Sequence, residues 1–582
     1  MTSVTRVANA TTFSELLALR AESAPDDLAF TFLVDGETDE DVVTYHELYR
    51  RSSAIAARLR GPAAPGDRAL LLFPPGLDYV AALLACWHSG VIGVSTAPPQ
   101  PKRLERTLGR LLGVAADADP VCVLTTPALW EAARPLLGED QPLARAEWIA
   151  IDDARTLESD LADPVQVDRD DVAFLQYTSG STAAPRGVML THGNLLDNSE
   201  LIARAFEHSP ETKTFMWLPP YHDMGLIGGI LQPIYVGCRC VLTSPVAMIR
   251  RPARWLEGIS RHRATTSGGP NFAYDLCVRK IEPDVRERLD LSSWDLAFNG
   301  AEPVRAETIE AFTAMFEPHG FSRLAFYPCY GLAEATLMTT GPAKTAAPSL
   351  RAFDADALEQ GLARPATDSR RAATLVGCGQ TADGHELRVV SPETQRTCPA
   401  DAVGEIWIAG PSVAKGYWRR EQLTEQTFGA RLATEPRAGP YLRSGDLGVV
   451  RDDELFVVGR IKDLLIVNGR NVHPHDVEAV AEGAHPRLRP HSSAAFGMGS
   501  DAELALVLEV NEASPAELAE ALEAIRKRVA SELDLQLHAV TLCHAGEVPK
   551  TTSGKIQRRL CRSLLEKGEI AAAAEWRLRA QR

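Results

Sequence analysis

The sequence predicts an α/β protein with a large N-terminal domain and a small α+β C-terminal domain. The first observation is that helical patterns alternate with short apolar runs through the first half of the chain, which is typical of largely parallel sheets. The second is that after about residue 373 short strands are separated by Gly, Asp and Pro, which indicates a β-rich part. The third is the length of 582 residues, which allows two to four domains at roughly 150 residues each.

The elements follow one another in chain order. In the first half we expect helices at 44–60 and 79–90, and strands at 69–73, 121–125, 172–177 and 239–243. In the β-rich part we expect strands at 386–390, 404–409 and 454–458. Near the C-terminus we expect strands at 464–467 and 504–510, and helices at 475–482 and 514–533. These patterns predict a large domain over 1–459 and a small domain over 460–582, with a weakly periodic segment at 338–374 that indicates an insertion.

Charge and cysteine usage exclude several classes of protein. With 61 Lys plus Arg against 77 Asp plus Glu, the net charge is −16, which argues against a general nucleic-acid or anionic-membrane binder. The ten cysteines contain no CxxC pair, so reduced thiols are expected rather than a disulfide framework or zinc site. The polar N-terminus lacks the pattern of a signal peptide, and the most apolar window, residues 79–94, is too short and polar to span a membrane. We therefore expect a cytoplasmic protein.

One loop has the composition of a polyphosphate-binding site. The apolar run at 172–177 leads into the sequence YTSGSTAAPRG at residues 177–187. Hydroxyl groups and backbone N–H groups in such a loop can surround phosphates, and a basic residue adds charge. The spacing differs from that of a Walker loop. The candidate phosphate-binding residues are Thr178, Ser179, Gly180, Ser181, Thr182 and Arg186.

Six further motifs follow in order. They are WLPPYHDMG (217–225), NGAEP (299–303), YGLAE (330–334), SGD (444–446), GRIKD (459–463) and KTTSGK (550–555). Together with the phosphate loop they resemble the adenylate-forming superfamily of acyl-CoA synthetases, peptide-synthetase adenylation domains and luciferases. The resemblance covers about residues 44–560 and implies a large adenylating domain over which a small mobile domain closes.

The closer resemblance is to fatty acyl-AMP ligases. It rests on three segments, FLQYTSGS (174–181), YGLAEATL (330–337) and GRNVHPHDVE (469–478). The segment at 338–374 lies where that branch carries an insertion, which packs between the two domains and restrains movement toward an arrangement that uses coenzyme A. The alternative is a loop without functional consequence, because long surface loops are often tolerated.

The resemblance implies a reaction. A fatty carboxylate attacks the α-phosphorus of ATP, pyrophosphate leaves, and the acyl chain passes to the phosphopantetheine thiol of an acyl carrier protein or of a carrier domain in a polyketide or peptide synthase. Chemistry of this kind depends on positioning and charge neutralisation more than on a protein nucleophile. Two alternatives remain open, a fatty acyl-CoA synthetase that uses free coenzyme A and an inactive acyl-adenylate-binding protein. Most relatives act as monomers, so a monomer is expected.

The resemblance also implies catalytic and metal-binding residues. Lys555 resembles the lysine that bridges the carboxylate and the α-phosphate. His222 resembles the histidine near the carboxylate end of the acyl pocket, with a positioning role. Glu334 resembles the Mg²⁺ ligand, with assistance from Thr178, and magnesium bound to ATP typically takes only one or two protein carboxylates.

Other residues are implied to bind the nucleoside or to move. Asp446, with Arg460 beside it, is expected to accept the ribose hydroxyls, and Lys462 occupies the position of the superfamily hinge. The ring of Tyr330 offers one face for adenine. The remaining adenine-site residues are Gly300, Ala301, Glu302 and Gly331.

The acyl chain is expected between residues 221–230 and 266–276. The candidate pocket residues are Tyr221, Met224, Gly225, Gly268 and Gly269. The last two glycines are chosen because small residues leave room for a chain.

Three remaining features need an interpretation. The basic stretch of Lys555, Arg558, Arg559, Arg562 and Lys567 is either a solvated helix face or a docking patch for an acidic carrier protein. The phosphate loop has Ala183 where relatives commonly have Gly, and Arg186 where many have Lys, which indicates a retuned site. The sequence GCGQTA at 377–382 matches a dinucleotide-binding pattern, but the residues after it indicate turn and strand, so no such site is expected.

Overall fold

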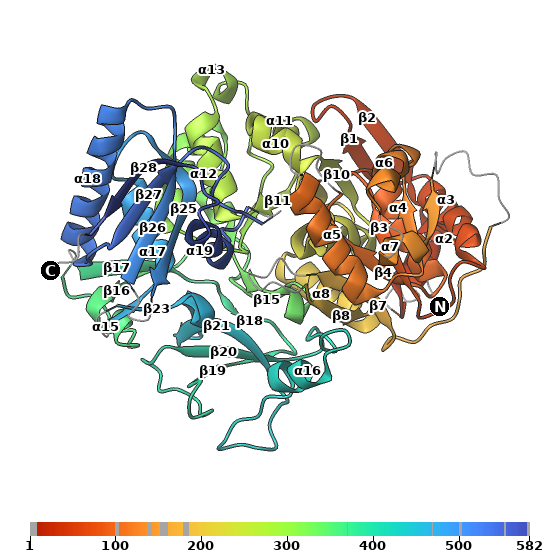
Figure 1. The fold of residues 1–582 in the computed structure, drawn as a ribbon. Helices are drawn as coiled ribbons and strands as arrows, with labels where there is room; N and C mark the ends of the chain where they lie inside the picture. Colours follow the sequence, from red (N-terminus) through yellow and green to blue (C-terminus); the bar gives the residue numbers. More distant parts are fainter. Residues whose placement is uncertain are drawn as a thin grey trace.

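The structure is a computed structural model. It describes residues 9–98, 104–137, 141–151, 161–177, 185–368, 371–467, 470–499, 503–551 and 554–578, without the side chains of 104–107 and 136. Two sheets of mainly parallel strands form its larger part (Figure 1). The first sheet has the order β6-β5-β3-β4-β7-β8, in which only β8 runs antiparallel to its neighbour. Its strands are β3 Arg68–Leu72, β4 Ile92–Ser95, β5 Cys122–Thr125, β6 Glu147–Ala150, β7 Val172–Tyr177 and β8 Gly187–Thr191.

The second sheet has the order β13-β12-β11-β9-β10-β1-β2, and only its edge strand β2 is antiparallel. Its strands are β1 Leu28–Leu33, β2 Glu40–Thr44, β9 Lys213–Met216, β10 Arg239–Thr243, β11 Thr266–Gly269, β12 Leu296–Asn299 and β13 Phe326–Pro328. Strands β11, β12 and β13 are buried along their whole length, as parallel strands covered on both faces should be.

Helices alternate with these strands, as the sequence predicts. They are α2 Phe13–Ser23, α3 Tyr45–Leu59, α4 Leu77–His88, α5 Leu104–Ala118, α6 Pro127–Ala133, α7 Pro142–Arg145, α8 His192–Ala205, α9 Gln232–Val236, α10 Pro245–Arg250, α11 Ala253–His262, α12 Asn271–Lys280, α13 Pro283–Arg286 and α14 Ala306–Phe316. Helix α3 begins where it does because Thr44 and Glu47 form a reciprocal capping box. The 3₁₀ turns are η2 Arg134–Leu136, η4 Glu317–His319, η5 Arg323–Ala325, η6 Ala333–Ala335 and η8 Ile461–Asp463, and η3 Met224–Leu231 is a π-helix.

The β-rich part follows. The strands β19 Glu386–Val390, β20 Gly404–Ala409, β21 Leu442–Arg451 and β22 Glu454–Arg460 form one antiparallel sheet. Strands β14 Tyr330–Gly331, β15 Met338–Gly341 and β18 Gln380–Thr381 form a second, and helix α16 Glu421–Phe428 follows β20. The residues after GCGQTA are turn and strand, as the sequence predicts, and not the helix of a dinucleotide-binding motif.

The weakly periodic segment is ordered in the parts that the structure describes. Strands β16 Leu350–Asp354 and β17 Ala372–Val376 pair antiparallel, and helix α15 Ala355–Glu359 follows β16. Phe353 packs edge-on against Phe456 of β22 at 5.5 Å between ring centroids. In Figure 1 this segment lies between the β-rich part and the C-terminal elements.

The C-terminal part is a separate α+β unit with its own apolar core, which includes Val477, Leu506 and Ile525. Its sheet has the order β25-β26-β27-β28. The elements are β23 Leu465–Val467, β24 Arg470–Val472, α17 Pro474–Glu482, β25 Leu488–Met498, β26 Glu503–Val510, α18 Pro515–Leu533, β27 Ala539–Cys543, α19 Arg558–Glu566 and β28 Ala572–Arg577. The predicted fold class is therefore confirmed, whereas the domain boundary at 459/460 stays a prediction.

Candidate functional site

The candidate site lies at the carboxyl ends of the second sheet, where open α/β sheets bind ligands. Residues 300–302 follow β12, Tyr330 follows β13, and His222 lies shortly after β9. Asp446 comes from β21 of the β-rich sheet, and the loop that carries Lys555 comes from the C-terminal unit. Segments that are far apart in the sequence thus contribute residues to one candidate site.

Asp446 is the centre of a polar cluster in which Asp446 and Tyr330 are buried and Arg460 is partly exposed. The Tyr330 hydroxyl donates to its Oδ2 at 2.9 Å, and Arg460 Nε contacts its Oδ1 at 2.9 Å. Asp446 and Arg460 are cross-strand partners on β21 and β22, so the sheet register sets their approach. Asp446 raises the pKa of the Arg460 guanidinium against the opposing effect of burial, which keeps this cation charged. The carboxylate is thereby held in one orientation.

The predicted adenine walls are fixed by close backbone packing. A Cβ at Gly300 would lie 2.8 Å from the carbonyl oxygen of Cys329, and one at Gly331 would lie 1.7 Å from that of Leu337. Ala301 has a positive φ of 69°. Glu302 Oε1 accepts the backbone N–H of Phe272, in the first turn of α12, at 2.7 Å, where a carboxylate is stabilised by the helix dipole.

Glu334 lies half-buried beside an aromatic hydroxyl. Tyr417 donates its hydroxyl to Glu334 Oε1 at 2.9 Å, and the Arg186 guanidinium lies 5.9 Å from the centre of the Tyr417 ring. No cluster of three or more His, Cys, Asp or Glu side chains that could hold a metal ion occurs among the described residues. A single carboxylate here fits Mg²⁺ carried by nucleotide phosphates, which supply most of its oxygen ligands.

The central phosphate-loop residues lie outside the described residues. They are Thr178, Ser179, Gly180, Ser181 and Thr182. The structure describes both flanks of this loop. At the first, the Tyr177 hydroxyl donates to Asp117 of α5 at 2.8 Å, and at the second, Pro185 packs toward Gly113 of the same helix.

Lys555 reaches the site on a short loop packed against the large part. Thr551 Oγ1 accepts the backbone N–H of Lys555 at 3.0 Å, and the Lys555 carbonyl accepts from Thr551 at 2.8 Å. Gly554 has a φ of +86°, which favours glycine, and its missing Cβ would lie 3.1 Å from the ring of Phe272. Since Glu302 holds the Phe272 backbone, the lysine loop packs against the predicted adenine site.

Charged residues of the predicted substrate site surround Lys555. Burial lowers the pKa of its ammonium and Arg460 lowers it further, while Asp223, Glu302 and Asp446 oppose that shift. The Lys555 ammonium therefore lies among carboxylates from three different segments of the large part, with the Arg460 guanidinium nearby.

His222 is a neutral side chain in this setting. Burial, followed by the charges of Arg110 and Lys555, lowers its pKa to about 3. The ring therefore carries no charge at neutral pH and can orient a carboxylate only through hydrogen bonding. Burial raises the pKa of the adjacent Asp223 carboxyl.

Buried histidines predict an acid-sensitive stability. Burial lowers the pKa of His192 to about 4, whereas an unfolded histidine titrates near 6.5. As the pH falls below 6.5, the unfolded state gains a proton that the folded state does not, so the free energy of unfolding falls until about pH 4. For His192 the loss between pH 6.5 and pH 5 is about 2 kcal/mol.

Thermal unfolding of the wild type and of His192→Gln at pH 7 and pH 5 checks this prediction. Between pH 7 and pH 5 we expect the melting temperature of His192→Gln to fall less than that of the wild type. The melting temperature of His46→Gln, whose side chain is exposed, should fall by as much as that of the wild type. Equal losses in wild type and His192→Gln would contradict it.

Gly268 and Gly269, which are expected to leave room for an acyl chain, pack closely against neighbouring residues. A Cβ at Gly268 would lie 2.2 Å from the carbonyl oxygen of Phe298, and one at Gly269 would lie 2.6 Å from the Trp217 ring. Their small size admits these close neighbours. Gly225 likewise approaches the Pro219 carbonyl, with a Cβ distance of 2.1 Å. A place for Gly225, Gly268 and Gly269 in the acyl pocket stays a prediction.

Tyr221 directly precedes His222 on the segment between β9 and η3, and Met224 is the first residue of η3. The carbonyl of Tyr221 accepts from Gln176 Nε2 of β7 at 3.1 Å, which fastens the segment to the first sheet. Met224 donates its backbone N–H to Asp223 Oδ1 at 2.8 Å. Their contact with an acyl chain stays a prediction.

The predicted hinge position and the basic stretch contact each other. Lys462 is in η8, and its carbonyl accepts from Arg559 Nη2 at 3.3 Å. Arg558 is mostly buried and forms a bidentate ion pair with Glu478, so this residue fits neither a solvated helix face nor a docking patch. Arg562 pairs with Glu566 on the same helix at 2.7 Å.

The sequence reasoning missed several neighbours of the site. Asp223 adjoins His222 within one motif and could have been found there. Arg110 and Tyr417 come from α5 and from the segment before α16, and neither has a local signal. Only the tertiary fold brings them near His222 and Glu334.

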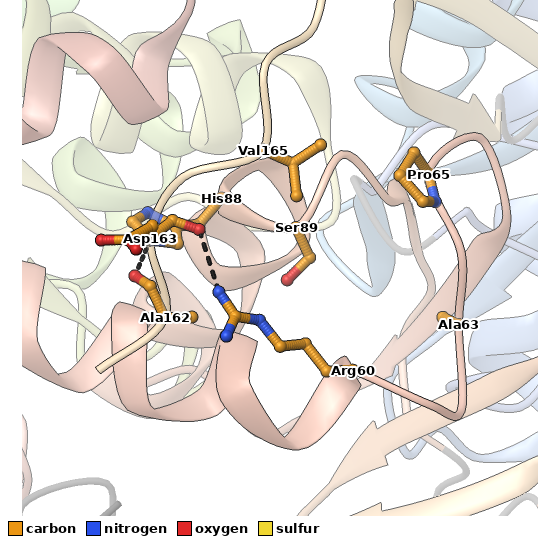
Figure 2. Close-up of a pocket in the computed structure, with 8 residues that line it drawn as sticks. All are labelled: Arg60, Ala63, Pro65, His88, Ser89, Ala162, Asp163 and Val165. Atoms are coloured by element: carbon orange, nitrogen blue, oxygen red, sulfur yellow. Dashed lines mark hydrogen bonds between the residues drawn. The ribbon is translucent and has the colours of Figure 1, made fainter. Parts of the chain in front are cut away.

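A small cavity of about 80 Å³ lies elsewhere, between α3, α4 and residues 162–165 (Figure 2). Arg60 donates to the carbonyl of Asp163 at 3.3 Å. His88 lies between the Ala162 carbonyl, at 2.7 Å, and the Ser14 hydroxyl, at 3.1 Å. These polar groups fasten the 162–165 segment to the fold, and we assign no ligand to the cavity.

Comparison with known proteins gives consistent matches. The family description "AMP-binding enzyme" matches residues 17–418. The medium-chain-fatty-acid–[acyl-carrier-protein] ligase JamA of Moorena producens is 42% identical, over 96% of both chains. The long-chain-fatty-acid–AMP ligase FadD26 of Mycobacterium marinum is 36% identical, over 94% of this chain and 96% of that one.

A solved structure extends the similarity. The fatty acyl-adenylate ligase of Legionella pneumophila, in complex with acyl adenylate and pyrophosphate, superposes with a TM-score of 0.76 at 38% identity, over 98% of both chains. Within the described ranges of this chain, no helix is both long and apolar enough to cross a membrane.

Proposed function

The chain belongs to the AMP-binding enzyme family, and from that premise we propose that it is a fatty acyl-AMP ligase. A carboxylate oxygen of the fatty acid attacks the α-phosphorus of ATP, the bond to the bridging oxygen of the β-phosphate breaks, and pyrophosphate leaves. The phosphopantetheine thiolate of an acyl carrier protein then attacks the acyl carbonyl, and AMP leaves. The activity is that of an AMP-forming ligase.

One observation carries this proposal. Lys555 arrives from the C-terminal unit at the carboxylates of Glu302 and Asp446, beside the neutral His222. This is the arrangement that adenylate formation needs, because negative charge develops between the attacking carboxylate and the leaving pyrophosphate. A cation on a separate unit can be present for that step and withdrawn afterwards.

The remaining residues then have defined roles. Asp446, fixed by Tyr330 and Arg460, accepts the ribose hydroxyls. The adenine lies between Tyr330 and residues 300–302. His222 orients the fatty carboxylate without contributing charge, because its pKa is about 3. The acyl chain extends past Tyr221 and Met224.

We propose ATP as the nucleotide and Mg²⁺ as its metal. Glu334 would hold the metal, with Thr178 assisting, and Tyr417 orients the Glu334 carboxylate. When bound, Mg²⁺ neutralises phosphate charge at the leaving group. Arg186, which lies beside Tyr417, adds a permanent positive charge on the same side.

Fatty-acid-dependent exchange of labelled pyrophosphate into ATP, with the purified chain and magnesium, tests this function. We expect exchange that requires both the fatty acid and the metal. Absence of exchange across fatty acids of several lengths would overturn the assignment and favour an inactive acyl-adenylate-binding protein.

The inserted segment supports a carrier protein over free coenzyme A as the acyl acceptor. Glu359, at the end of α15, accepts from Arg470 Nε at 2.6 Å and Nη2 at 2.8 Å. Arg470 belongs to β24 of the C-terminal unit, while Phe353 of the same segment packs on β22. The segment thus contacts both units, and we propose that it restrains their rearrangement toward the use of coenzyme A.

Glu359→Ala is expected to raise acyl-CoA formation about two- to fivefold, since a partly exposed ion pair contributes up to about 1 kcal/mol. Mass spectrometry of products formed with free coenzyme A measures this. Asp356→Asn is the matched control, because Asp356 pairs with Arg371 within the same segment. Unchanged acyl-CoA formation by Glu359→Ala would contradict the restraining role.

We also propose that the enzyme acts in the cytoplasm as a monomer. The ten cysteines of the sequence are all free, and most are buried. Unpaired thiols in this number suit a reducing compartment.

A further inference from the structure

We propose that Asp463 and Arg558 are positioning residues that join the hinge segment to the Lys555 loop, so that the two move as one body. The inference rests on the proposed function, because it concerns how Lys555 is delivered for adenylate formation. It goes beyond that function because it assigns a positioning role to two side chains that have no part in the proposed chemistry.

Arg558 connects three parts of the C-terminal unit. It is the first residue of α19 and follows the Lys555 loop directly. Its Nε and Nη2 each lie 2.7 Å from a Glu478 oxygen on α17, and its Nη1 lies 3.4 Å from Asp463 Oδ2 in η8. The side chains of Arg558, Glu478 and Asp463 are 21%, 6% and 17% exposed, so water screens these charges weakly.

Two further contacts stiffen this connection. Arg559 donates to the Lys462 carbonyl at 3.3 Å, so α19 contacts η8 twice. Glu478 Oε1 also accepts the backbone N–H of Ala495 on β25 at 2.9 Å. Helices α17 and α19, strand β25 and the hinge turn are therefore fastened together.

On the other side of the hinge, the chain is held to the large part. Arg460 is held by Asp446 of β21 at 2.9 Å, whereas Lys462 and Asp463 are held by α19. Between Arg460 and Asp463 lie Ile461 and Lys462, the predicted hinge position. A rotation there carries Lys555 together with Asp463.

Removing the contact at Asp463 separates a positioning role from a structural one. Asp463→Asn leaves the Arg558–Glu478 pair in place, so we expect an unchanged melting temperature. The rate constant kcat for pyrophosphate exchange should fall about tenfold with the KM values for ATP and fatty acid unchanged, because substrates bind to the large part. Asp463→Glu, which keeps the charge, should recover most of the lost kcat.

Arg562→Gln is the matched control, because Arg562 lies on the same helix but pairs locally with Glu566. We expect it to exchange pyrophosphate like the wild type. An Asp463→Asn enzyme with wild-type kcat, or one whose loss is in KM alone, would overturn the inference. If the wild type exchanges pyrophosphate, either of these results leaves the proposed function intact. A wild type that shows no exchange would contradict the proposed function.

Discussion

Lys555→Ala is expected to lower kcat for adenylate formation by about 10²–10³-fold, the loss typical for removing one preorganised charge donor from a reaction centre. The KM for ATP should change little, because the nucleoside contacts proposed above come from the large part. The Lys555 loop rests on Phe272 through Gly554, so the ammonium is preorganised before the substrates react. Pyrophosphate exchange measures the effect.

Lys567→Ala is the control for this prediction, since its side chain is exposed on the same basic stretch. Lys555→Arg should recover only part of the rate, because the planar guanidinium differs in shape from an ammonium. A Lys555→Ala enzyme with more than about a tenth of the wild-type kcat would contradict the role given to this lysine, since a lost donor of this kind costs more.

Asp446→Asn is expected to raise the KM for ATP by about 10- to 150-fold, corresponding to about 1.5–3 kcal/mol for hydrogen bonds to a charged group. The change removes the negative charge that accepts the ribose hydroxyls. It also weakens the contacts with Tyr330 and Arg460 that hold this side chain in place. Initial rates of exchange against ATP concentration measure it.

Tyr330→Phe is the matched comparison for Asp446→Asn. It keeps the aromatic face and removes one hydrogen bond to Asp446, so the KM for ATP should rise only about fivefold, equivalent to about 1 kcal/mol. An equal rise in both variants would show that Tyr330, rather than the Asp446 charge, determines nucleotide binding.

The fold class could be predicted from the sequence because its signals are local. The helix expected at 44–60 is observed as α3 Tyr45–Leu59, with its start fixed by the Thr44 and Glu47 capping box. The inserted segment was less predictable. Its strand β16 is only partly buried, so it lacks the regular alternation of a strand with one covered face.

The site could be predicted only as far as its motifs extend. Asp446 and Tyr330 lie in separate motifs, and the structure brings them within 2.9 Å. Arg558 belongs to a run of basic residues, which gave no sign that Glu478 and Asp463 surround it. The sequence does not show that Gly268 and Gly269 pack closely against Phe298 and Trp217. In each case the missing information is a long-range contact.

Mass spectrometry of the products tests the central claim most directly. The purified chain would be incubated with Mg-ATP and dodecanoic acid, in parallel with a phosphopantetheinylated acyl carrier protein and with free coenzyme A. We predict acyl-adenylate in both reactions, acyl chains loaded on the carrier, and little acyl-CoA. Efficient acyl-CoA formation without loading of the carrier would contradict the fatty acyl-AMP ligase assignment.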